Sequence, residues 1–147
     1  MPPTYVAFRE DLSEGTEVYH NDLRARWNRG DADVVAAMKY WADLTSSFRA
    51  TLLAGDHKEM NQLVNANFDK RASLYDVGDG NRDMVATARR VGASANFAGS
   101  GGAIVGFYED DAMFTRLQQA FSSKGIRVIK PDFAPTLLAE AGLSAVK

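Results

Sequence analysis

Apolar residues in this chain follow two spacings, one of two residues and one of three or four. Alternation is typical of strands and occurs in three short runs, "TYVAF" from position 4, "AIVGFY" from 103 and "GIRVIK" from 125. In the first run, Tyr5 and Ala7 fall on one side, and Val6 and Phe8 fall on the other. We therefore predict strands at these three places.

Spacings of three and four residues predict helices at about 16–27, 34–52, 56–75, 84–91 and 110–123. A further short helix is expected around "PTLLAEAG", after Pro131. The second helix carries one stripe that should face a core: Val34, Met38, Trp41, Thr45, Phe48 and Leu52. Asp56 is a good N-cap, with Glu59 completing a capping box, and Asp79 or Asn81 can cap the fourth helix. The order predicts an α+β domain with a small antiparallel sheet.

Length and composition favour one globular domain over residues 1–147. Of these residues 46% are hydrophobic and none is cysteine, so the core must hold without disulfides. The net charge of −2 offers no basic surface to nucleic acid. No apolar run reaches the roughly 18 residues of a membrane span, and the start does not resemble a signal peptide. We expect a cytoplasmic protein with no nucleic-acid or membrane partner.

Glycines concentrate in "GASANFAGSGGAIVGFY", positions 92–108. In a structural interpretation Gly92 ends a helix, residues 99–102 form a hairpin loop, and Gly106 is a bulge or a tight packing point. In a functional interpretation, Gly99, Gly101 and Gly102 let the main chain approach phosphates or another loop. The stretch matches neither a Walker motif nor a dinucleotide fingerprint, because it precedes a strand and has no Lys followed by Ser or Thr.

Three segments in order, "VYHNDLRARWNRGD", "NANFDKRASLY" and "MVATARRVGASANFAGSGG", resemble the carboxy-terminal half of GHMP small-molecule kinases, above all glucuronokinase-like sugar kinases. The resemblance covers about residues 4–130. It implies an α+β domain related to the ferredoxin-like arrangement, and an ATP-dependent, magnesium-assisted transfer of phosphate to a sugar or uronic acid. The implied nucleotide-side residues are Ser94, Gly99, Ser100, Gly101 and Gly102.

The chain departs from the family pattern in two respects. Many members carry a Lys and a Thr where this chain has Asn96 and Ala98. The phosphate loop and catalytic Asp of the amino-terminal half have no match here, so no catalytic residue is assigned. We expect a domain that is inactive alone, that needs an amino-terminal kinase half in the same chain or a separate subunit, and that forms a homodimer through an exposed apolar face.

Acceptor-side candidates are polar residues on helical stripes. Asn67 and Arg71 share the inward line of their helix, either to bind substrate or with Arg71 paired to Asp69 or Asp76. Arg24 lies on a stripe with His20 and Trp27, which is either a solvated basic face or a partner for a uronic acid carboxylate.

Two other charged groups have structural interpretations. The "EDDA" carboxylates at 109–112 should cap a helix rather than bind metal, and Arg89 and Arg90 should form a solvated helix end. Two functions stay open: the carboxy-terminal domain of a sugar kinase, or a stand-alone ligand-binding or regulatory module of the same fold.

Overall fold

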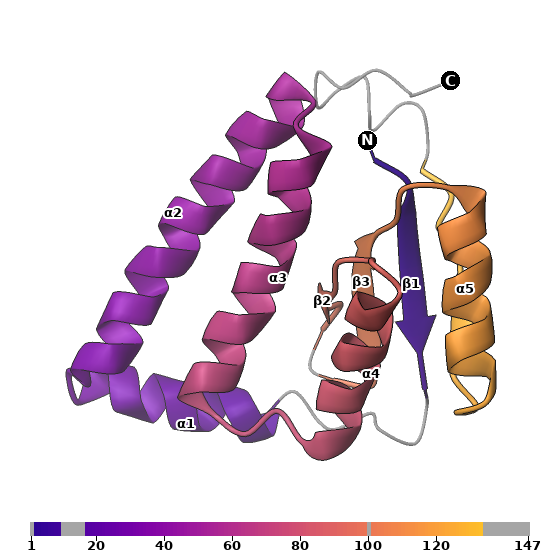
Figure 1. Cartoon of the computed structure of the whole chain (residues 1–147). Helices are drawn as coiled ribbons and strands as arrows, with labels where there is room; N and C mark the ends of the chain where they lie inside the picture. The colour runs from indigo at the N-terminus through magenta and orange to yellow at the C-terminus, as the bar shows by residue number, and fades with distance from the viewer. Residues whose placement is uncertain (1, 10–16, 100, 134–147) are drawn as a thin grey trace.

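The computed structural model describes residues 2–9, 17–99 and 101–133 (Figure 1). Its elements follow one another as β1 Thr4–Phe8, α1 Glu17–Asn28, α2 Ala32–Ala54, α3 His57–Leu74, α4 Asp79–Arg90, β2 Asn96–Phe97, β3 Ala103–Phe107, α5 Asp111–Ser122 and β4 Arg127–Ile129. The predicted α+β class with a small antiparallel sheet is confirmed. The helix expected at "PTLLAEAG" lies outside the described residues.

The sheet has the strand order β2-β3-β1-β4, and each neighbouring pair is antiparallel. Alternation along β1 places Tyr5 and Ala7 on the buried face, opposite Gly106 and Ile104 of β3. Helices α4 and α5 lie along this face and supply Met84, Leu117 and other apolar side chains (Figure 1). The main core therefore lies between the sheet and these two helices.

Three aspartates cap helices through their side chains. Asp31 accepts hydrogen bonds at the start of α2, Asp56 accepts from the amide of Glu59 at α3, and Asp110 accepts from Met113 at α5. The predicted caps at Asp56 and in the "EDDA" segment are confirmed. The predicted cap at Asp79 or Asn81 is wrong, because Gly78 occupies that position and the Asn81 side chain is engaged elsewhere.

The apolar stripe of α2 does not face the core as predicted. Val34 is fully buried, but Met38 is 37% exposed and Thr45 is also exposed. The reason is that α2 packs mainly along α3 and stands away from the sheet (Figure 1). Its Phe48 reaches the sheet, where the ring stacks on Phe107 with centroids 6.1 Å apart.

The second face of the sheet is apolar and only partly covered. Val6 and Val105 pair on it and are half-buried, as is Phe8 at the end of β1. Ile129 of β4 pairs with Val6 and is 44% exposed.

Among the described helices, none is long and apolar enough to cross a lipid bilayer.

A tight backbone contact joins the glycine-rich segment to the sheet. A Cβ atom on Gly106 would lie only 1.8 Å from the carbonyl oxygen of Ser94. That oxygen accepts a 2.8 Å hydrogen bond from the Tyr5 hydroxyl. Burial raises the pKa of Tyr5 above its ordinary value, so the hydroxyl remains a donor. The prediction that Gly106 marks a tight packing point is confirmed.

Replacing Gly106 with Ala should destabilise the domain by about 3 kcal/mol or more, because the new methyl group meets backbone that cannot move aside cheaply. Urea denaturation measures the change. Gly99→Ala is the matched control, since nothing lies within 4 Å of its Cβ position, and it should stay within about 0.5 kcal/mol of the wild type. Equal stability of the two variants would contradict the contact.

Candidate functional site

The glycine loop, residues 98–102, joins β2 to β3. The Ala98 amide donates to the carbonyl oxygen of Ala103 at 3.0 Å, which closes the hairpin. Gly101 and Gly102 have φ angles of 138° and 71°, in a region that L side chains rarely adopt. The predicted hairpin loop is confirmed, while Ser100 lies outside the described residues.

Asn81 fixes the conformation of the glycine loop. This side chain is 5% exposed, and its Oδ1 accepts a 2.8 Å hydrogen bond from the Gly102 amide. Its Nδ2 donates to the carbonyl oxygen of Val77 at 2.9 Å. A Cβ on Gly101 would lie 3.2 Å from Nδ2. The loop is therefore clamped to the start of α4, a role that local sequence pattern does not reveal.

Gly99 differs from the other described glycines of the loop. It is exposed, its φ is not positive, and nothing lies within 4 Å of the position its Cβ would take. The fold of this domain therefore does not require glycine at 99. The absence of a side chain at 99 instead leaves room for a ligand or another loop to approach the backbone.

Ser94, a predicted nucleotide-side residue, lies in the core. It is 1% exposed, and its Oγ accepts a 2.9 Å hydrogen bond from the Phe107 amide. Its own amide donates to the Phe107 carbonyl oxygen. These bonds suit a residue that positions the segment leading to β2, and direct contact of Ser94 with nucleotide stays a prediction.

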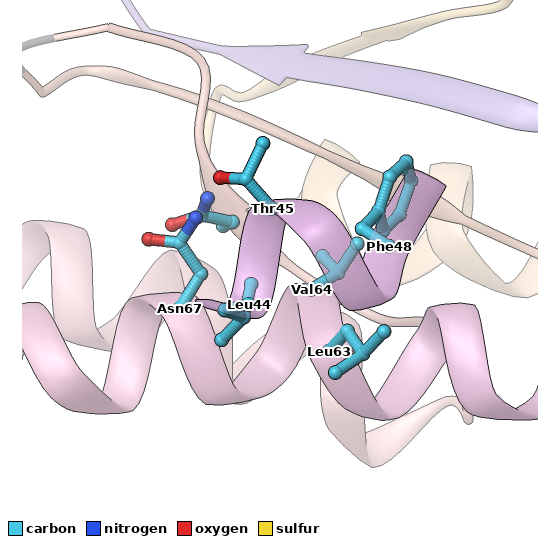
Figure 2. A pocket seen from close by; sticks show the side chains of 7 residues that line it. Leu44, Thr45, Phe48, Leu63, Val64 and Asn67 are labelled. Atoms are coloured by element: carbon cyan, nitrogen blue, oxygen red, sulfur yellow. The ribbon is translucent and has the colours of Figure 1, made fainter. Parts of the chain in front are cut away.

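A cavity of about 230 Å³ lies between α2, α3 and β2 (Figure 2). One part of its wall is apolar and the other is polar, and the lining residues are Leu44, Thr45, Phe48, Leu63, Val64, Asn67 and Asn96. Thr45 and Phe48 belong to the α2 stripe. Those stripe positions that the sequence assigned to a core therefore line this cavity instead.

Arg71 extends the polar part of the cavity wall. Its Nε donates to Oδ1 of Asn67 at 3.2 Å, and its guanidinium carbon lies 5.8 Å from the centre of the Trp41 ring. The predicted structural partners are occupied, Asp69 by Arg89 and Asp76 by Arg82.

Among the residues the structure describes, no carboxylate pairs with Arg71, which is half-buried. An unpaired guanidinium beside a cavity is suited to an anionic ligand. The structure thus brings Asn67 and Arg71 together, as their shared helical line predicts.

Arg24 lies elsewhere. Its exposed side chain lines a separate cavity of about 280 Å³ with Leu23, Trp27 and Met38, between α1 and α2. Trp27 is 47% exposed, so this surface is open to solvent. The structure does not bring Arg24 into the cavity of Asn67, and the His20 side chain lies outside the described residues.

Arg89 is not part of a solvated helix end, contrary to the prediction. Its Nε and one Nη donate to the side-chain and main-chain oxygens of Asn65, and its other Nη pairs with Asp69 at 2.7 Å. The same Asn65 Oδ1 accepts from the Ala95 amide at 3.0 Å. This network joins α3, α4 and the segment before β2, and so supports the position of Asn96 in the cavity wall.

Comparison with known proteins identifies the family. The model of the family "GHMP kinases C terminal" matches residues 48–127, more than half of the chain. The chain therefore belongs to the GHMP kinase carboxy-terminal domain family. Probable glucuronokinase 2 and glucuronokinase 1 of Arabidopsis thaliana are 32% and 33% identical to it over 150 residues, covering 99% of this chain. The chain spans 41% of the length of each of these relatives.

Solved structures agree on the fold. The L. major mevalonate kinase in complex with R-mevalonate superposes with a TM-score of 0.77 at 21% identity, over 91% of this chain and 44% of the kinase. The Lin0012 protein from Listeria innocua has a TM-score of 0.78 at 12% identity, over 88% of this chain and 38% of that protein. At these identities the likeness establishes the fold alone.

Removing the Asn81 clamp should loosen the glycine loop. Asn81→Ala removes the side-chain hydrogen bonds to the Gly102 amide and the Val77 carbonyl. It should therefore lower the free energy of unfolding by about 1–3 kcal/mol. Hydrogen exchange of the Gly102 amide should accelerate. Asn81→Asp keeps the acceptor for Gly102 but loses the donor to Val77, so it should destabilise the domain while retaining much of the Gly102 protection. Unchanged exchange in Asn81→Ala would show that the clamp does not hold the loop.

Proposed function

We propose that this chain is the carboxy-terminal half of an ATP-dependent sugar kinase whose acceptor is a sugar or a uronic acid. The observation that carries this proposal is the match along 99% of the chain to two glucuronokinases. Because the chain spans 41% of each relative, the remaining parts of the enzyme belong to an amino-terminal half, in the same chain or in a separate subunit.

The chemistry suits such a division of labour. Phosphoryl transfer depends mostly on positioning and on stabilising charge, so a domain that shapes the cleft contributes without holding a base. In this proposal the glycine loop, with Gly99, Ser100, Gly101 and Gly102, approaches the phosphates of ATP, and Ser94 positions the segment that leads to it. Asn67 and Arg71 form the acceptor side.

Magnesium would be held mainly by the nucleotide and the amino-terminal half. Among the described residues, no three His, Asp or Glu side chains are grouped so as to hold a metal ion. The ion, when bound, would neutralise charge that develops on the transferred phosphoryl group. The role of this domain is then to supply uncharged backbone that can approach the phosphates of ATP closely.

The apolar second face of the sheet is the proposed contact surface for the amino-terminal half. Its half-buried Val6, Phe8 and Val105, together with the exposed Ile129, form an apolar surface of the kind that docking covers. Without that half the domain should bind ATP weakly, transfer no phosphate and associate with itself through this face.

Two glycine substitutions separate a ligand contact from a loop constraint, when assayed together with the amino-terminal half. Gly99→Val meets nothing within 4 Å in this domain, so it should preserve the unfolding midpoint while lowering kcat about 100-fold. Gly101→Val should lower both the unfolding midpoint and kcat, because the φ of 138° at this position is unfavourable for valine and the Asn81 side chain lies close. Near wild-type kcat for Gly99→Val would reduce the loop to a hairpin without a nucleotide role.

Two arginine substitutions test where an acceptor carboxylate binds. Arg71→Ala should raise KM for glucuronic acid about tenfold more than KM for glucose, because a charge-assisted contact is lost for the carboxylate alone. Arg24→Ala, in the separate cavity, should change both KM values less than twofold. A selective effect of Arg24→Ala, with none for Arg71→Ala, would move the carboxylate to the α1–α2 cavity.

A further inference from the structure

Asn96 presents an unpaired polar atom at the wall of the cavity between α2, α3 and β2. Its backbone pairs with Val105 of β3, and its side chain is one of those lining the cavity. The Oδ1 atom is buried and has no hydrogen-bond partner within the described part of the chain. Folded proteins rarely leave such an acceptor unpaired, because its lost hydration is not repaid. The arrangement is therefore suited to a ligand that donates a hydrogen bond.

Asn67 offers the complementary group. Its side chain lines the same cavity, and its Oδ1 accepts from Arg71, so the Nδ2 of this amide is the group it can offer as a donor. The cavity wall therefore places the buried, unpaired acceptor of Asn96 together with the amide group of Asn67. A hydroxyl group both donates and accepts, so adjacent hydroxyls of a small ligand match this pair.

The remaining wall limits the ligand further. Leu44, Phe48, Leu63 and Val64 are apolar, and no charged side chain lines the cavity itself. Its volume of about 230 Å³ lies below the roughly 300–1,000 Å³ typical of sites for drug-sized ligands. One small ring with an apolar face and hydroxylated edges fits these features, and a triphosphate does not.

We infer that this cavity receives the uncharged, hydroxylated ring of the acceptor sugar, and that Asn96 is a specificity-determining residue which accepts a hydrogen bond from a ring hydroxyl. The inference rests on the proposed kinase function and extends it. Arg71, which adjoins the cavity through Asn67, then lies where a carboxylate on the same ring would be bound. Ring and carboxylate are recognised by different residues.

Titration of the 147-residue chain followed by NMR tests this inference directly. The probes are glucuronic acid and tetrahydropyran-2-carboxylic acid, which keeps the ring and carboxylate but lacks the hydroxyls. Glucuronic acid should perturb the amides of Asn96, Asn67 and Thr45, and the analogue should bind at least tenfold more weakly. Equal affinity for the two probes, or no binding of glucuronic acid, would overturn the inference.

Asn96→Leu separates recognition from structural support. The substitution keeps a similar side-chain size and removes the unpaired acceptor, so affinity should fall about tenfold while Tm rises by about 2–4 °C. Asn61→Leu is the control, because Asn61 lines a different cavity, and it should leave affinity unchanged without raising Tm. Unchanged affinity in Asn96→Leu, or a fall in both affinity and Tm, would contradict the assigned role.

The outcome is distinguishable from failure of the kinase proposal. Phosphorylation of glucuronic acid by the wild-type chain supplied with an amino-terminal half would uphold the kinase function whatever the cavity binds. If that activity is present and Asn96→Leu leaves KM for glucuronic acid unchanged, only the inference about the cavity is wrong.

Discussion

The close approach of Ser94 to Gly106 is the contact on which the rest of the domain depends. It lets the segment before β2 approach β3 at backbone distance, and the Tyr5 hydroxyl fixes it there with a 2.8 Å hydrogen bond. Two residues later the chain pairs with β3 as β2, the edge strand of the sheet. The positions of Asn96 in the cavity wall and of the glycine loop beyond it both follow from this one contact.

The two sides of the domain have different physical characters. Helices α4 and α5 close one face of the sheet around a continuous apolar core. On the other side, α2 and α3 pack on each other and leave a cavity beside β2, next to a sheet face that is only partly covered. Rigid packing on one side thus supports polar groups on the other, and this suits one wall of a cleft that a second domain completes.

Local pattern was sufficient to predict much of the fold. The alternation in β1, the cap at Asp56 and the existence of a hairpin loop between β2 and β3 were predictable from neighbouring residues, and the structure confirms them. Asn81 and Arg89 were misinterpreted, because their partners lie 21 and 20 to 24 residues away in sequence. No periodicity encodes such contacts, and only the folded chain brings them together.

The candidate site was predictable to the same limited extent. A shared helical line correctly placed Asn67 beside Arg71, and the resemblance drew attention to the glycine loop. Apolar spacing predicts that the α2 stripe is buried in a core. The same spacing also occurs in residues that line a cavity, so it does not distinguish the two. Departures from the simple pattern, such as exposed Thr45 within that stripe and unpaired Asn96, coincide with the surface where we propose acceptor binding.

The central claim is that this domain forms one wall of a sugar-kinase cleft, and reconstitution tests it most directly. ATP-dependent phosphorylation of glucuronic acid would be measured with the 147-residue chain alone, with an amino-terminal GHMP kinase half alone, and with both together. The account predicts phosphorylated sugar only when both are present. Activity of the amino-terminal half that is unchanged by this chain, or full activity of this chain by itself, would contradict it.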